Sequence, residues 1–122
     1  MTINEAINML DSQKHNTFSR QDKLHWLSRL DGQIHRELLC LYGKKPEDFT
    51  GYTPETDPDT TLLVPAPWDE IYLHYMTAQV DYLSGEMTRY ANAAALYNAV
   101  LAAYVRYFNR THQAAGGYWK YF

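Results

Sequence analysis

The chain has 122 residues, of which 46% are hydrophobic and 20% are charged, and its net charge is −3. This length and apolar content are sufficient for one small domain with a modest hydrophobic core, and they exclude a largely disordered chain. The weak acidic charge gives no support for a basic patch that would bind nucleic acid through its phosphates.

A short helix is predicted at the start of the chain. Thr2 and Glu5 have the three-residue spacing of a capping box, in which each side chain accepts a hydrogen bond from the other residue's backbone. The apolar residues that follow recur at helical spacing. They are Ile3, Ile7 and Leu10.

A second, longer helix is predicted from Ser19 to Gly43, because Ser19 and Asp22 provide a start signal and Gly43 provides a stop. Asp31-Gly32 lies inside this helix, where glycine is less favourable than alanine by about 1 kcal/mol. We therefore expect a kink or a close contact with another helix at this point. The apolar stripe of this helix consists of Leu24, Leu27, Leu30, Ile34, Leu38 and Leu41.

Residues 44–66 predict a long loop, because prolines, glycine and acidic side chains replace the apolar periodicity. Loops of this length usually have a function or are mobile. The one apolar run in the loop is Leu62-Leu63-Val64. It predicts either a short extended segment or, as we expect, a contact that holds the loop against the helices.

Two more helices are predicted in the second half of the chain. Pro67 suits the first position of a third helix, and Asp69 and Glu70 favour the positive end of its dipole. This helix ends near Gly85, and the last helix begins at about Glu86 with an apolar stripe over five turns. The stripe residues expected to pack against other helices or subunits are Tyr90, Ala94, Tyr97, Leu101, Tyr104 and Phe108.

The last helix is also rich in alanine, which allows neighbouring helices to approach closely. We therefore expect this helix to be buried on more than one side, within the domain or between subunits. The alanines are Ala91, Ala93, Ala95, Ala99, Ala102 and Ala103. Together these patterns predict an all-α fold, a small bundle of about four helices with a long central loop and an extended C-terminal tail.

The sequence divides into a helical domain, residues 1–113, and an aromatic C-terminal tail, residues 114–122. Exposed aromatic side chains at the end of the tail would favour aggregation. We expect them either to fold back over the helices or to insert into a partner, where aromatic anchors dominate the binding free energy. These candidate partner-binding residues are Tyr118, Trp119, Tyr121 and Phe122.

No segment predicts membrane insertion or secretion. The longest nearly apolar run, residues 93–105, is shorter than the ~18 residues that a membrane span needs, and no basic and apolar leader opens the chain. Cys40 is the single cysteine and lies among leucines. It is expected to pack as a small apolar side chain in a reducing compartment.

Few residues have a spacing that suits catalysis or metal binding. Glu70 and His74, four residues apart on one predicted helix, would supply two metal ligands where three or four are usual. Cys40 and His35 would point in different directions, which argues against a thiol nucleophile with its base. Nucleotide-binding, acyl-transfer and metal-binding motifs are also absent from the sequence. We therefore expect no enzyme activity, no cofactor and no bound metal.

Three segments carry a likeness to a known family. Residues 57–70 read DPDTTLLVPAPWDE, Tyr97 is followed by Asn98, and residues 107–112 read YFNRTH. Together they resemble the small head-tail connector proteins of tailed bacteriophages and prophages. The likeness extends over nearly the whole chain, from the helix with Trp26 to the aromatic end, and its motifs are structural, with no catalytic residues to carry over.

The resemblance implies a mostly helical adaptor in the virion neck, made in the host cytoplasm. Such adaptors assemble as a ring, usually of twelve copies, beneath the portal protein, and contact the next neck or tail-completion protein. DNA passes through the ring without specific binding, which suits a mildly acidic chain because basic phosphate contacts would hold the DNA. A C-terminal segment commonly docks on the portal, and residues 118–122 stand at the corresponding place in this chain.

Two other interpretations remain open. One is a small dimeric adaptor or regulatory module of the host, in which the tyrosine-rich last helix forms the interface. The other is a metal-binding helical bundle that uses Glu70 and His74, which elemental analysis of the purified protein would detect.

Overall fold

The computed structural model describes residues 1–112, so the aromatic tail lies outside the described part of the chain. The fold is an all-α bundle of four helices with a long central connection, as the sequence predicts. The helices are α1 (Ile3–Gln13), α2 (Arg20–Glu37), α3 (Ile71–Leu83) and α4 (Met87–Thr111), with two short 3-10 turns, η1 (Leu39–Tyr42) and η2 (Pro46–Asp48). Across residues 1–112 no helix is apolar over the length that a membrane span would need.

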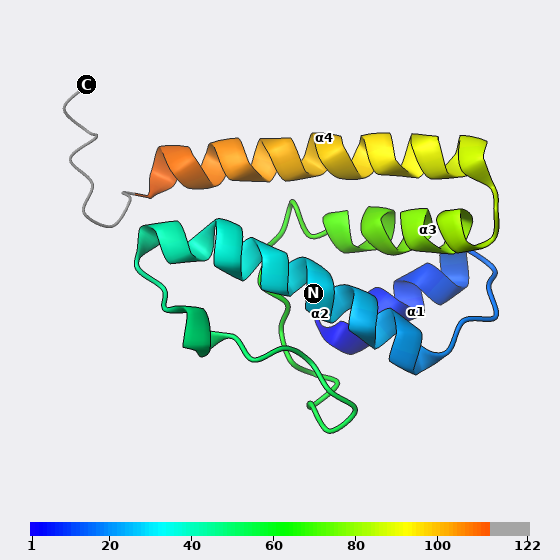
Figure 1. Cartoon of the computed structure of the whole chain (residues 1–122), viewed down its shortest axis with the longest axis horizontal. Coiled ribbons are helices and arrows are strands. Elements are labelled where there is room, and N and C mark those ends of the chain that lie inside the picture. The colour runs from blue at the N-terminus through cyan, green and yellow to red at the C-terminus, as the bar shows by residue number, and fades with distance from the viewer. Residues whose placement is uncertain (113–122) are drawn as a thin grey trace.

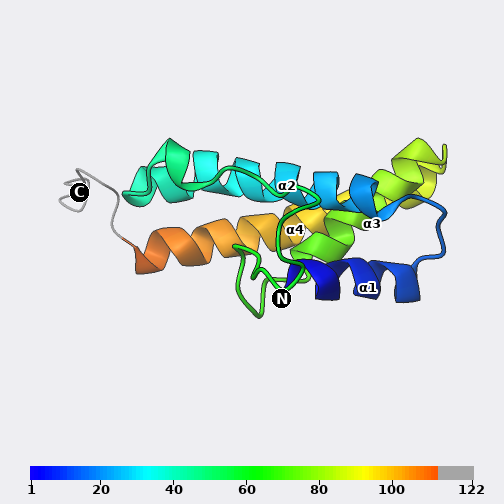
Figure 2. The same ribbon diagram turned by 90° about the horizontal axis from the view of Figure 1, so that it is seen from below.

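The helix pair α3 and α4 organises the bundle. The two helices run antiparallel around Gly85, whose φ of 77° lies in the left-handed region that favours glycine. α4 has 25 residues and α3 has 13, so the C-terminal half of α4 extends beyond α3 and runs alongside the C-terminal half of α2 (Figure 1). Seen from below, α1 and α2 lie on opposite sides of α3 (Figure 2).

The core forms where the apolar stripes of the four helices meet. The capping box of Thr2 and Glu5 starts α1 as predicted, and an ion pair of 2.6 Å between Lys14 and the buried Asp81 joins α1 to α3. Each fully buried aliphatic side chain contributes about 1.5–3 kcal/mol relative to an exposed one. The largest side chains with less than 2% exposure are mainly apolar: Ile3, Leu10, Leu27, Leu30, Val64, Ile71, Tyr72 and Met76, with one carboxylate, Asp31.

The prediction that the second helix continues to Gly43 is wrong. The α-helix ends at Glu37, and a tighter 3-10 turn continues to Tyr42, where Gly43 adopts a φ of 106°. Because a 3-10 turn advances the side chains by a larger angle than an α-helix, Leu41 does not continue the buried stripe. Its side chain is 58% exposed.

Two further expectations for the central part of the chain are also wrong. α2 is an uninterrupted α-helix through Gly32, and a Cβ at this position would meet the ring of Phe49 in the loop at 3.6 Å, not another helix. The third helix begins at Ile71 and not at Pro67. Two successive turns delay its start, because Trp68 N–H donates to the Pro65 carbonyl and Ile71 N–H donates to the Trp68 carbonyl.

α4 is buried on one side only within the single chain. Of its alanines, Ala93 is buried, whereas four lie exposed on the outer face of the helix. The expectation that other parts of the same domain would cover a second side of α4 is therefore wrong. That a neighbouring subunit covers this side stays a prediction. The four exposed alanines are Ala91, Ala95, Ala99 and Ala102.

Candidate functional site

Two surfaces of α2 perform different tasks. Its apolar stripe faces the other helices, and a polar stripe of Ser28, Asp31 and His35 faces the connection, defined here as residues 43–70. The spacings of three and four residues place these polar side chains on one face of the helix. Each of the three forms a hydrogen bond with the connection.

Asp31 is the centre of this polar stripe and is fully buried. Its carboxylate accepts hydrogen bonds from the Tyr52 hydroxyl, from the Tyr72 hydroxyl at 2.6 Å and from Leu63 N–H at 3.1 Å. The Tyr72 hydroxyl in turn accepts from Val64 N–H at 2.8 Å. A buried carboxylate is tolerated only with such partners, and one residue of α2 thereby fixes both the connection and α3.

The pKa values in this cluster follow from its burial. Burial raises the pKa of Asp31, and the three donors partly oppose that shift because they favour the charged carboxylate. Burial and the neighbouring Asp31 carboxylate also raise the pKa values of Tyr52 and Tyr72, so both hydroxyls remain donors at neutral pH. With Asp31 closed to solvent, this cluster holds the structure together and offers no open site for a substrate.

Ser28 and His35 fix the connection on either side of Asp31. Ser28 Oγ accepts from Tyr52 N–H at 3.0 Å, and the adjacent Gly51 has a φ of 89° and leaves only 3.0 Å between a Cβ and that oxygen. His35 Nε2 donates to the Lys45 carbonyl at 2.8 Å, and its ring stacks on Phe49. The connection is thus tied down over most of its length.

The apolar run in the connection is held against the core, as predicted. Leu62 and Val64 are buried, and Leu62 N–H donates to the Met1 carbonyl at 2.9 Å. The acidic tip, residues 53–59, carries the exposed side chains of Glu55, Asp57 and Asp59, and its Pro58 carbonyl accepts from Asn4 N–H at 3.0 Å. Figure 1 shows this tip on the opposite side of the molecule from α4.

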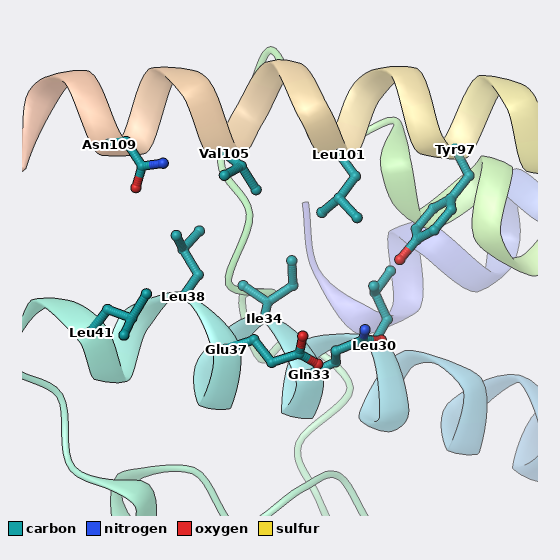
Figure 3. Close-up of a pocket in the computed structure, with 10 residues that line it drawn as sticks. All are labelled: Leu30, Gln33, Ile34, Glu37, Leu38, Leu41, Tyr97, Leu101, Val105 and Asn109. Atoms are coloured by element: carbon teal, nitrogen blue, oxygen red, sulfur yellow. The ribbon is translucent and has the colours of Figure 1, made fainter.

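An apolar groove lies between α2 and the C-terminal half of α4, in the space that the shorter α3 leaves (Figure 3). Its cavity volume is about 210 Å³. Leu38 and Ile34 point up from α2 toward Leu101 and Val105 of α4. The residues that line this α2–α4 groove are Leu30, Gln33, Ile34, Glu37, Leu38, Leu41, Tyr97, Leu101, Val105 and Asn109.

The polar groups of the groove lie at its edges. The Tyr42 hydroxyl donates to Asn109 Oδ1 and closes the end nearest the C-terminus of α4. At the other end, burial, with smaller effects of Tyr75 and Glu37, raises the pKa of Tyr97 to about 12. The groove thus has an apolar centre with few hydrogen-bonding groups, which suits an apolar or aromatic side chain better than a charged ligand.

The predicted packing residues of α4 face the other elements of the same chain. Tyr104 and Phe108 are buried, and Tyr90, Ala94, Tyr97 and Leu101 are half-buried. Their aromatic partners are Tyr82 for Tyr90 and Tyr75 for Tyr97, each at 5.3 Å between ring centroids, Trp68 for Tyr104 at 5.7 Å, and Tyr42 for Phe108 at 5.0 Å. The tail residues Tyr118, Trp119, Tyr121 and Phe122 lie outside the described residues.

The structure assembles no metal or thiol site from the other candidate residues. Glu70 is exposed and lies one residue before the start of α3. Across residues 1–112 no group of three potential metal ligands occurs. Cys40 is half-buried in η1, while His35 is engaged with the connection through Lys45.

Sequence reasoning missed the polar stripe of α2 and the groove. The stripe had a readable signal, because Ser28, Asp31 and His35 recur at helical spacing beside the apolar stripe. The groove had none, since it depends on the unequal lengths of α3 and α4 and on the 3-10 turn that exposes Leu41.

A scan against protein-family models, a search of curated proteins and a search of solved structures find no match to this chain. The function is therefore inferred from the surfaces described above and from the resemblance carried by residues 57–70, 97–98 and 107–112.

Proposed function

We propose that this chain is a structural head-tail connector of a tailed bacteriophage or prophage. It joins the portal protein to the next neck or tail-completion protein as an oligomeric ring around the DNA channel, and it performs no catalysis. The virion neck is its site of action after synthesis in the host cytoplasm.

The outer face of α4 is the observation that carries this proposal. Four alanines lie exposed along this face, and Leu96 among them is 53% exposed. Small side chains allow another helix to approach the backbone closely, and the exposed Asn98 and Arg106 beside them can form polar contacts with such a helix. In a ring, a neighbouring copy covers this face.

The charge distribution supports a head-to-tail arrangement of copies. The acidic tip lies on one side of the molecule, and α4, with the exposed Arg89, Arg106 and Arg110, lies on the other (Figure 1). Opposite charges on opposite sides favour a contact between two different surfaces of adjacent copies. Repetition of such a heterologous contact closes a ring when the rotation between copies permits it.

Two of the segments behind the family resemblance also pack together. Trp68, from residues 57–70, stacks on Tyr107, from residues 107–112, at 4.1 Å between ring centroids. Trp68 also contacts Tyr104 on the same face of α4. These residues hold α4 on the connection, so that its outer face remains available to a partner.

Native mass spectrometry of the full chain, alone and mixed with the portal protein encoded in the same genome, tests this function. We expect rings of about a dozen copies, alone or on the portal oligomer. The variant Ala95→Glu should prevent ring formation while the circular dichroism spectrum stays unchanged, because it places a charge in the covered face. Asn8→Glu adds the same charge at an exposed position of α1 and serves as the control.

A stable dimer that ignores the portal would overturn the proposal and favour a dimeric adaptor module. Rings that form equally well with Ala95→Glu and Asn8→Glu would show that the outer face of α4 is not the contact between copies.

A further inference from the structure

Most of the exposed large apolar side chains of the described chain lie at two places. Within residues 1–112, five such side chains are more than half exposed. Tyr82, Leu83 and Met87 define the corner between α3 and α4, and Leu41 lies at the rim of the α2–α4 groove. The corner and the C-terminal half of α2 lie toward opposite ends of the molecule (Figure 1), so the corner cannot cover the groove of its own chain.

We propose that the α3–α4 corner of one copy docks in the α2–α4 groove of the next copy, with Met87 inserted beside Leu41. This contact rests on the proposed ring, and it names the two surfaces that meet there. Because the two surfaces are different, the contact is heterologous and leaves one corner and one groove for further copies. In a closed ring, every copy then has both surfaces covered.

The size and the open side of the groove suit a side chain of a protein partner. Its volume of about 210 Å³ is below the roughly 300–1,000 Å³ of small-molecule pockets. The hydrogen bond between Tyr42 and Asn109 closes one end. The groove is open along its side, because Gln33, Glu37 and Leu41 at the edge of its α2 wall are all exposed. The flexible methionine of the corner can fill an irregular apolar gap of this kind.

The charges beside the two surfaces are complementary. In the sequence, the methionine of the corner lies between Glu86 and Arg89, and the leucine at the groove rim lies between Glu37 and Lys44. All four charged side chains are exposed, and none has an ion pair within residues 1–112. In the docked pair Arg89 faces Glu37, and Glu86 faces Lys44. Two pairs of opposite charges beside the apolar contact fix its orientation.

The corner also continues the outer face of α4. Met87, Ala91 and Ala95 follow one another at steps of four residues, which places them on one side of the helix, and all three are exposed. A copy that docks its corner in a groove therefore brings the start of its outer face against the same neighbour. The contact thus agrees with the loss of ring formation expected for Ala95→Glu.

Charge reversal in the full chain tests this contact. Arg89→Glu and Glu37→Arg each place two like charges opposite each other, and the double variant restores an opposite pair. Neither reversal threatens the fold, because both positions are exposed and each new charge suits its helix end, an acid in the first turn of α4 and a base in the last turn of α2. The control Arg20→Glu makes the same change at the first residue of α2, which belongs to neither surface.

The readout is the concentration at which half of the chain is assembled, measured by native mass spectrometry over a concentration series with and without the portal protein. We expect each single reversal to raise this concentration at least about tenfold, and the double variant to return it to within about threefold of the wild-type value. Met87→Asn, at a side chain that is 51% exposed, should raise it by about tenfold as well. Arg20→Glu should leave it unchanged.

The outcomes distinguish this contact from the connector function. Rings that either single reversal leaves unchanged, or that the double variant does not restore, would overturn the contact and leave the connector function standing. A closed dimer that the single reversals weaken and the double variant restores would keep the corner in the groove and overturn the ring. A wild-type chain that does not assemble, with or without the portal, would overturn both.

Discussion

The two faces of α2 differ in whether their contacts are complete within the chain. On the polar stripe, the buried Asp31 finds three donors within the chain, and in residues 1–112 no buried side-chain polar atom lacks a partner. On the apolar side, the C-terminal part of the same helix borders an open groove with the exposed Leu41 at its rim. A buried polar group costs free energy unless it forms hydrogen bonds within the fold, whereas an apolar surface can stay exposed to solvent and is then available to a further contact. The polar face therefore has all its hydrogen-bonding partners within the described fold, and the apolar face leaves a groove open to solvent.

The largest effect is expected when the centre of the polar stripe is removed. Asp31→Ala leaves the hydroxyls of Tyr52 and Tyr72 and the N–H of Leu63 without their acceptor in the interior. Each unsatisfied buried group destabilises by about 1–3 kcal/mol, so we expect a loss of about 3–5 kcal/mol in the free energy of unfolding, with partial relaxation of the half-buried Tyr52. Urea unfolding followed by circular dichroism measures this loss.

The conservative variant Asp31→Asn separates hydrogen bonding from charge. Its carbonyl oxygen still accepts from two of the three donors, so we expect a loss smaller than that of Asp31→Ala. Equal losses for the two variants would show that the acceptor at this position does not hold the connection.

A smaller effect is expected from pH, and its sign follows from the raised pKa of Asp31. In the folded chain this carboxyl keeps its proton to a higher pH than in the unfolded chain, where the usual value is 3.8. Between the two pKa values the folded state binds more protons, so its stability decreases as pH rises through this range. Each unit of pKa difference corresponds to about 1.4 kcal/mol.

The difference between the wild-type chain and Asp31→Asn isolates this contribution. We expect the free energy of unfolding of the wild type, relative to Asp31→Asn, to be greatest below pH 3.8 and to decrease as pH rises from there toward neutral. Urea titrations at several pH values measure it, and a difference that is constant with pH would contradict the assignment.

The smallest effect is expected on the groove side. Leu101→Ala should destabilise the chain by about 1–2 kcal/mol, because Leu101 is half-buried and one side of it already faces the open groove. Leu27→Ala, at a fully buried position of α2, is the matched comparison and should cost about 3–5 kcal/mol. Thermal unfolding distinguishes the two. Similar losses would mean that the groove wall is packed as tightly as the core.

Much of the fold could be predicted because it depends on local rules. The capping box at Thr2 and the helical spacing of the apolar residues predict α1, α2 and α4, and the run at Leu62 predicts the contact that holds the connection. The start of α3 could not be read from Pro67, because two turns near Trp68 take over the first residues of the predicted helix. Propensity is a weak signal wherever neighbouring segments compete for the same backbone groups.

The candidate sites divide in the same way. Ser28, Asp31 and His35 were visible as a polar stripe, but their partners lie 10 to 41 residues away in the sequence. The alanine content of α4 predicted burial on more than one side, whereas within the described chain one side of the helix stays exposed, and composition alone could not tell which side this would be.

The sequence by itself determined the all-α class, the four helices and the absence of a strong charge field, because capping, periodicity and net charge are properties of short segments or of composition. Only the tertiary structure decided that a carboxylate of α2 would fix the connection, that Leu41 would face solvent, and that a groove would open between α2 and α4. These features arise from the unequal lengths of α3 and α4 and from hydrogen bonds between distant residues, which no local pattern specifies.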